Sequence, residues 1–90
     1  MGIEAELDGK IEAYRSATHH GALKIMFILA SEEAGFTEIM FRSRLSPSVL
    51  NKLLKSLVRY GMIKKDDGKY TLTRKGELIL ERLLEIVELL

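Results

Sequence analysis

Cysteine, tryptophan and glutamine are absent from this chain of 90 residues, and proline and asparagine occur once each. Without cysteine the chain can form neither a disulfide framework nor a thiolate metal site. The lack of glutamine and the single asparagine accompany many glutamate, lysine, leucine and isoleucine residues, a composition typical of proteins that work at high temperature. We therefore expect a thermophilic source.

Long apolar runs are also lacking. The longest, residues 25–30, is far shorter than the roughly 20 residues that a membrane-spanning helix needs. The sequence also begins without a recognisable signal peptide, so we expect a cytoplasmic protein that does not enter a membrane. Ninety residues suffice for one small domain with a thin core, which association with a second copy would help to stabilise.

Positive charge is concentrated in the middle of the chain, although the net charge of the whole is only +1. Counting Lys and Arg against Asp and Glu gives −3 for residues 1–34, +7 for residues 35–76 and −3 for residues 77–90. A basic segment between acidic flanks indicates a surface for a polyanion.

The stretch Leu45–Gly61 is the most clearly marked helix. Ser46 can cap the free amides at its start, Pro47 suits its first turn, and Gly61 can adopt the left-handed conformation that ends it. At 100° per residue, four leucines fall on one face and four polar side chains on the other. The leucines are 50, 53, 54 and 57, and the opposite face carries Ser48, Lys52, Lys55 and Arg59.

Two helices are expected before this stretch. Residues 3–17 carry a narrow apolar stripe of Ile3, Leu7, Ile11 and Tyr14, although the Asp8-Gly9 pair could instead mark the true start of that helix. Thr18 is the candidate cap of the next helix, which extends to about residue 33. Its middle is apolar all round, so we expect neighbours to cover it and Met26 and Phe27 to lie in the core.

A short helix then precedes Leu45. The pair Gly35-Phe36 breaks the pattern and could form a stub of strand, after which Thr37 is the candidate cap of a helix over residues 38–43, with Ile39 and Met40 facing inward. A tight turn over residues 42–46 joins this helix to the next. This layout, with Leu45 buried at the turn, predicts a helix-turn-helix.

After Gly61 the pattern alternates, and Asp67-Gly68 predicts a two-residue β-hairpin turn. In this register Asp66 pairs with Lys69, residue 65 with residue 70, and residue 63 with residue 72. A helix-turn-helix followed by such a hairpin is a winged helix. The wing would present Lys64, Lys65 and Lys69, although the two aspartates make its tip less favourable to phosphate.

Thr73 is the candidate cap of a last helix over residues 74–90, whose apolar seam is too wide for one small domain to cover. We therefore predict one winged-helix domain over residues 1–90, mainly α with a small β-hairpin. It comprises a flanking helix (1–18), a winged helix-turn-helix core (19–73) and a dimerisation helix (74–90). The predicted dimer-interface residues are Ile3, Leu7, Ile11, Tyr14, Leu80, Leu83, Leu84, Val87 and Leu90.

The segment from Thr37 to Glu77 resembles the archaeal winged-helix family of small DNA-binding proteins, and it is similar also to regulators of the multiple-antibiotic-resistance (MarR) and arsenical-resistance (ArsR) types. The resemblance covers about residues 20–82. It implies an archaeal protein that dimerises through its terminal helices and binds duplex DNA with the helix that carries Ser48, Asn51, Lys52 and Lys55. The last helix is shorter than in relatives that pair through a long antiparallel coiled coil.

The leading functional hypothesis is a homodimer that binds double-stranded DNA, as a transcription regulator or as an architectural protein of the nucleoid. Lysines and arginines would contact phosphates, and Ser48 and Asn51 would approach base edges. The predicted DNA-binding residues are Arg42, Arg44, Ser46, Ser48, Asn51, Lys52, Lys55, Arg59, Lys64, Lys65 and Lys69. The alternatives are a merely solvated cationic face and a winged helix that binds other proteins in a transcription or replication assembly.

Neither a catalytic nor a metal-binding motif is recognisable, so we expect no enzyme activity and no cofactor. His19 and His20 are adjacent and point in different directions, so they are expected to be exposed rather than metal ligands. The sequence neither indicates nor excludes a pocket for a small-molecule effector.

Overall fold

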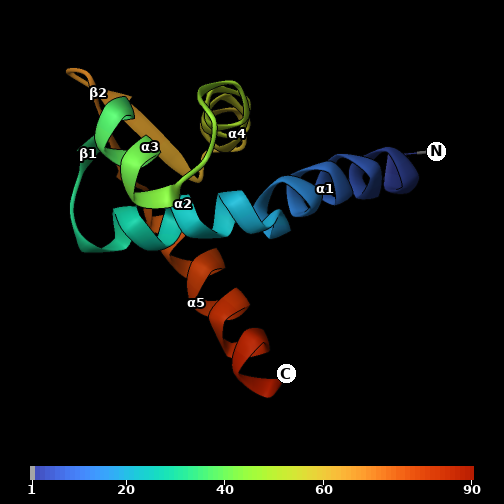
Figure 1. Cartoon of the computed structure of the whole chain (residues 1–90). Helices are drawn as coiled ribbons and strands as arrows, with labels where there is room; N and C mark the ends of the chain where they lie inside the picture. The colour runs from blue at the N-terminus through green and yellow to red at the C-terminus, as the bar shows by residue number, and fades with distance from the viewer. Residues whose placement is uncertain (1) are drawn as a thin grey trace.

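The computed structural model describes residues 2–90, and within them the chain forms five α-helices and three short strands (Figure 1). The helices are α1 (Gly2–Thr18), α2 (His20–Ser31), α3 (Phe36–Ser43), α4 (Pro47–Arg59) and α5 (Arg74–Leu89). The strands are β1 (Ala34–Gly35), β2 (Ile63–Asp66) and β3 (Lys69–Leu72). The predicted fold class, a mainly helical winged helix with a small β-hairpin, is confirmed.

Helix α1 projects away from the rest of the molecule, in nearly the same direction as α2 (Figure 1). It is continuous from Gly2, so the alternative start at Asp8-Gly9 is wrong. Residues 2–12 are all exposed, and only the last turns of α1 contact α2 and α4. Within residues 2–90, the apolar stripe on the projecting part is therefore left exposed.

The prediction that Thr18 caps α2 is wrong. Thr18 is the last residue of α1, and its hydroxyl donates a hydrogen bond of 2.8 Å to the carbonyl oxygen of Tyr14. His19 is the cap instead, because its Nδ1 accepts a hydrogen bond of 3.0 Å from the amide of Gly21. Both histidines are exposed and their rings are stacked, with centroids 4.8 Å apart.

Helix α2 is the centre of the core and contacts α1, α3, α4, α5 and β3. Ile25 and Met26 are completely buried, as expected for an apolar helix surrounded by other elements. Phe27 is 59% exposed, so its predicted place in the core is wrong. It points about 200° around the helix from Ile25, to a side that no neighbouring element covers.

Helix α3 begins at Phe36, and Gly35 occupies the capping position predicted for Thr37. Thr37 therefore lies within the first turn, and the strand stub is at Ala34–Gly35, one residue earlier than expected. Ile39 is buried and the turn after α3 passes through Arg44 in the left-handed conformation. The helix-turn-helix formed by α3 and α4 is thus present as predicted.

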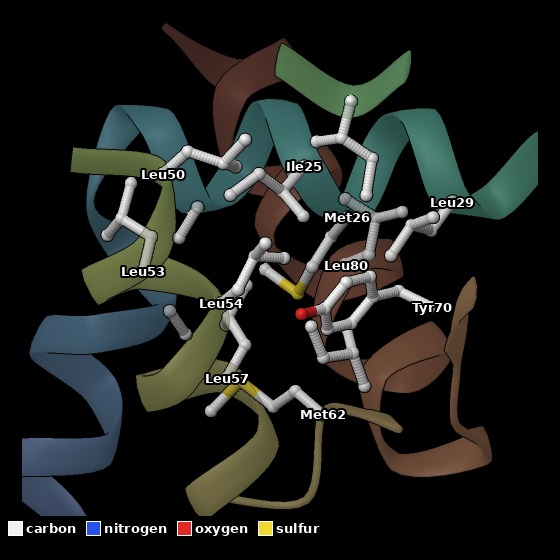
Figure 2. Packing of buried hydrophobic residues seen from close by; sticks show 14 of the residues in the cluster. Ile25, Met26, Leu29, Leu50, Leu53, Leu54, Leu57, Met62, Tyr70 and Leu80 are labelled. Atoms are coloured by element: carbon white, nitrogen blue, oxygen red, sulfur yellow. The ribbon is translucent and has the colours of Figure 1, made fainter. Parts of the chain in front are cut away.

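The leucine face of α4 packs on α2 (Figure 2). Leu50 and Leu57 are fully buried, and Leu53 and Leu54 are nearly so. At the start of α4 the Ser46 hydroxyl accepts a hydrogen bond of 3.3 Å from the amide of Val49. Because four leucines hold α4 by one side, the opposite face is presented to solvent.

The sheet has the strand order β1-β3-β2, and all its pairs are antiparallel. In the β2–β3 hairpin Ile63 is opposite Leu72, residue 65 opposite residue 70, and Asp66 opposite Lys69, which is the predicted register. Asp67 and Gly68 adopt positive φ angles of 52° and 77° at the turn. A two-residue turn of this kind requires such angles at both positions.

Helix α5 begins at its predicted cap, where the Thr73 hydroxyl accepts a hydrogen bond of 3.0 Å from the amide of Gly76. Leu80 is only 5% exposed and belongs to the core of its own chain, contrary to its predicted place in a dimer interface. It is buried because α5 packs on α2 at this turn. The end of α5 projects from the body, and Val87 is 49% exposed (Figure 1).

Within residues 2–90, none of the helices combines the length and apolar character that a membrane span requires.

Candidate nucleic-acid interface

The polar face of α4 carries five of the residues predicted for DNA binding, and all five are exposed. They are Ser48, Asn51, Lys52, Lys55 and Arg59. Among the described residues, no carboxylate forms an ion pair with any of the three cations. Lys52, Lys55, Ser56 and Arg59 line a hollow of about 410 Å³ on this face. The face is therefore a cationic surface whose charge is not neutralised by ion pairs with the described residues.

A groove of about 470 Å³ runs between α4 and the wing. Its lining residues are Asn51, Leu54, Lys55, Val58, Arg59, Lys65 and Tyr70. Four of the predicted binding residues, one of them on the wing, thus share one groove. Helix and wing together form a concave cationic surface rather than two separate patches.

The two neighbouring lysines of β2 point in opposite directions. Lys65 lies opposite Tyr70 and lines the groove, and its Nζ is 5.5 Å from the centroid of the Tyr70 ring. Lys64 lies opposite Thr71, and side chains alternate between the faces of a strand, so Lys64 points to the other face of the hairpin. Lys65 is therefore directed toward α4 and Lys64 away from it.

Two of the predicted residues are paired with carboxylates. An Arg42 nitrogen lies 3.6 Å from a Glu38 oxygen and 4.0 Å from a Glu32 oxygen. Lys69 lies 3.7 Å from Glu33, although Asp66 is its partner in the strand register. Exposed ion pairs of this kind contribute roughly 0–1 kcal/mol, so a phosphate could displace them, but they reduce the positive field nearby. Arg42 and Lys69 lie at the edge of the cationic surface, and α4 and Lys65 form its centre.

The remaining predicted residues lie at the ends of the helices. Arg44 ends α3 in the left-handed conformation and is exposed, and the Ser46 hydroxyl is already the cap of α4. Because a hydroxyl has further lone pairs and a rotatable proton, capping does not prevent Ser46 from contacting a phosphate as well.

Sequence reasoning missed two apolar residues on α4 and one aromatic residue beside it. Val49 and Val58 are about two-fifths exposed and flank the cationic face on opposite sides. Tyr70 is largely buried, yet it lines the groove between α4 and the wing. The positions of the two valines around the helix, at 100° per residue, could have identified them from the sequence. The predicted pairing of residue 65 with residue 70 could have identified Tyr70.

Within the described part of the chain, no cluster of three or more His, Asp or Glu side chains could hold a metal ion.

Residues 22–90 match the family model described as winged helix-turn-helix, so the chain belongs to that family. It is 34% identical over 67 residues to the uncharacterized protein MJ0290 of the archaeon Methanocaldococcus jannaschii. That match covers 74% of this chain and 32% of the relative, so the chain spans about a third of the length of that protein. The predicted resemblance to archaeal winged-helix proteins is confirmed.

Solved structures that share the fold include two bacterial proteins. The transcriptional repressor BigR from Xylella fastidiosa superposes with a TM-score of 0.74 over 94% of this chain and 89% of its own, at 18% identity. HlyU from Vibrio cholerae superposes with a TM-score of 0.69 over 90% of this chain and 94% of its own, at 23% identity. At these identities the likeness concerns the fold alone.

Proposed function

We propose that this protein binds double-stranded DNA as a homodimer and acts as a transcription regulator or as an architectural protein of the nucleoid. The observation that carries the proposal is the unpaired cationic face of α4, continuous with a groove whose far wall holds Lys65. Helix-turn-helix proteins place the corresponding helix in the major groove. Lys52, Lys55, Arg59 and Lys65 would contact phosphates, which position the protein but do not read sequence. BigR, which shares the fold, is described as a transcriptional repressor, and that description is consistent with the proposal.

The side chains that would contact base edges are those at the start of α4. Ser48 and Asn51 are exposed there, and an asparagine side chain can bond both N6 and N7 of adenine. Val49 adds an apolar side chain that suits the methyl group of thymine. These three residues would decide whether binding is sequence-specific.

The homodimer is supported by apolar surface that one chain leaves uncovered. Of the thirteen large apolar side chains exposed in the described residues, four are on α1, four are on α5, and Leu90 follows α5 directly. Two adjoining hollows of about 330 and 310 Å³ lie between these helices and share Tyr14, Ile79 and Leu83. Such a concentration of exposed apolar surface is typical of an interface.

Charge also favours a second copy as the occupant of these hollows. Three cations line them, namely Lys10, Lys75 and Arg82. The projecting part of α1 carries an apolar stripe flanked by the carboxylates Glu4, Glu6 and Asp8. The α1 helix of a partner therefore complements the hollows in both polarity and charge, and two-fold symmetry would make the exchange reciprocal.

The test is the salt dependence of binding to mixed-sequence duplex DNA. If each protomer neutralises roughly four phosphates, the slope of log K against log salt is about −7 for the dimer. A slope indistinguishable from zero would remove the proposal. Selection of bound sequences then separates the two roles, because a regulator enriches a defined site and an architectural protein does not.

A second candidate is a protein-interaction module that uses the same apolar terminal helices to hold a different partner. The exposed stripe on α1 favours it as much as it favours the homodimer. A monomer by light scattering that is not retained on DNA or heparin at low salt would select this candidate. A dimer that is retained would select DNA binding.

A further inference from the structure

Three consecutive backbone carbonyl groups that follow α4 accept hydrogen bonds from residues at the start of α5. The Tyr60 carbonyl oxygen accepts a hydrogen bond of 2.7 Å from Nζ of Lys75, and that of Gly61 accepts one of 2.6 Å from the Thr73 hydroxyl. The carbonyl oxygen of Met62 accepts one of 3.1 Å from the Thr73 amide. We call this contact between residues 60–62 and residues 73–76 the α4–α5 junction.

The fit at the junction is close. A Cβ atom added to Gly76 would lie 2.0 Å from the Met62 carbonyl oxygen, so only glycine allows the first turn of α5 to approach so near. The backbone of this turn is therefore fixed on the segment that follows α4. Three hydrogen bonds and a steric fit make the ends of α4 and α5 a single rigid unit.

Lys75 is the charged member of the junction. Its ammonium group bonds the carbonyl of the residue that caps the C-terminus of α4, where the helix dipole is negative. Its stem lines the hollow between α1 and α5. Lys75 thus connects the end of the proposed DNA-reading helix with the wall of the proposed dimer interface.

We propose that Lys75 is a positioning residue that fixes the direction of α4 relative to α5, and so the geometry in which a dimer presents its two α4 helices to DNA. This inference rests on the proposed DNA-binding function. Lys75 acts through the Tyr60 carbonyl and does not contact DNA. Its loss should therefore change the orientation of α4 without changing the number of phosphates that the protein neutralises.

The test compares Lys75→Met with Arg74→Met. Methionine keeps an apolar stem against the hollow but removes the ammonium group. Arg74 is the neighbouring residue, and its replacement loses the same charge, but its guanidinium pairs with Glu77 of its own helix, at 3.1 Å, rather than with the segment that follows α4. Lys75→Arg keeps a cation that can reach the Tyr60 carbonyl, and Lys75→Gln is a second loss variant should Lys75→Met fold poorly.

The absence of cysteine allows a direct measurement of the helix directions. Spin labels on Ser48→Cys and Glu88→Cys report the distance between the start of α4 and the end of α5, with labelled chains diluted into unlabelled protein to suppress signals between protomers. We expect a shifted or broadened distance distribution in Lys75→Met and an unchanged one in Arg74→Met and Lys75→Arg.

Affinity for mixed-sequence duplex DNA is the second readout. Lys75→Met should bind about 3- to 10-fold more weakly, the range that corresponds to the net contribution of one ordinary intramolecular hydrogen bond, with an unchanged salt slope. An unchanged distance distribution would overturn the positioning role. A shallower salt slope would do so too, because it would mean that Lys75 contacts phosphate itself. Wild-type protein that binds no DNA would refute the proposed function, while the distances would still decide whether Lys75 directs α4.

Discussion

The ammonium group of Lys65 lies 5.5 Å from the centre of the Tyr70 ring, on the neighbouring strand of the wing. An exposed cation–π contact of this kind contributes about 0.5–1 kcal/mol, enough to bias a flexible side chain toward one direction. Here the direction is toward α4, because both residues line the groove between α4 and the wing. The wing therefore adds one positioned cation to the face of the helix.

The first prediction uses the opposite directions of the two β2 lysines. Lys65→Met should weaken binding to duplex DNA and make the salt slope less negative by about 0.9 for each protomer, because one phosphate contact is lost. Lys64→Met removes the same charge from the other face of the hairpin and should have a smaller effect on the slope. Salt titrations of both variants check the prediction. Equal slopes for the two would mean that the groove does not hold the DNA backbone.

The second prediction concerns the centre of the α4 face. Lys52→Glu should weaken binding to all duplex sequences by about tenfold or more, because it replaces a phosphate contact by a repulsion. Arg15→Glu, a charge reversal on α1 outside the cationic face, is the matched control. Competition between a selected site and mixed-sequence DNA distinguishes the mechanism. A loss confined to the selected site would assign Lys52 to base reading instead.

The parts of the fold that the sequence predicted correctly have strong local signals. Ser46 and Thr73 cap their helices, and Asp67 and Gly68 form the turn that fixes the register of the wing. Such features depend on residues within a few positions of one another. For that reason periodicity and turn chemistry suffice to locate them.

The wrong predictions concern positions where contacts between residues far apart in the sequence, or an unusual capping residue, determine the local structure. Thr18 ends α1 and donates a hydrogen bond to a carbonyl oxygen of that same helix, so the cap of α2 is a histidine, which is outside the usual set of capping residues. Whether Phe27 is covered and whether Leu80 is free depends on which elements pack on each side of α2 and α5, which periodicity alone does not specify. The candidate site shows the same limit. The sequence identified its cations, but not that Lys65 faces α4 or that Arg42 and Lys69 are paired with glutamates.

The third prediction compares two helical glycines. Gly76→Ala should destabilise the protein severely, because its Cβ would lie 2.0 Å from the Met62 carbonyl oxygen and the α4–α5 junction would have to open. Gly9→Ala should stabilise the protein by about 0.5–1 kcal/mol, because Gly9 lies within α1 and nothing surrounds its Cβ position. Urea or thermal unfolding measures both. Similar stability changes of the same sign would show that the junction is not closely packed.

The fourth prediction tests the proposed dimer. Leu7→Glu places a charge in the exposed stripe of α1 and should convert the dimer to a monomer, because a buried unpaired charge strongly disfavours association. The fold of each chain should be unaffected, since Leu7 is 55% exposed within its own chain. Light scattering checks the mass and circular dichroism checks the fold.

Two further variants complete the dimer experiment. Phe41→Glu introduces the same charge at a 73% exposed position on α3, outside the terminal helices, and should leave the dimer intact. Leu80→Ala should instead cost about 2–5 kcal/mol of folding free energy, because Leu80 is in the core of its own chain. A Leu7→Glu protein that remains dimeric would mean that α1 is not in the interface. A wild-type protein that is monomeric at all concentrations would mean that the apolar faces of α1 and α5 serve a different partner.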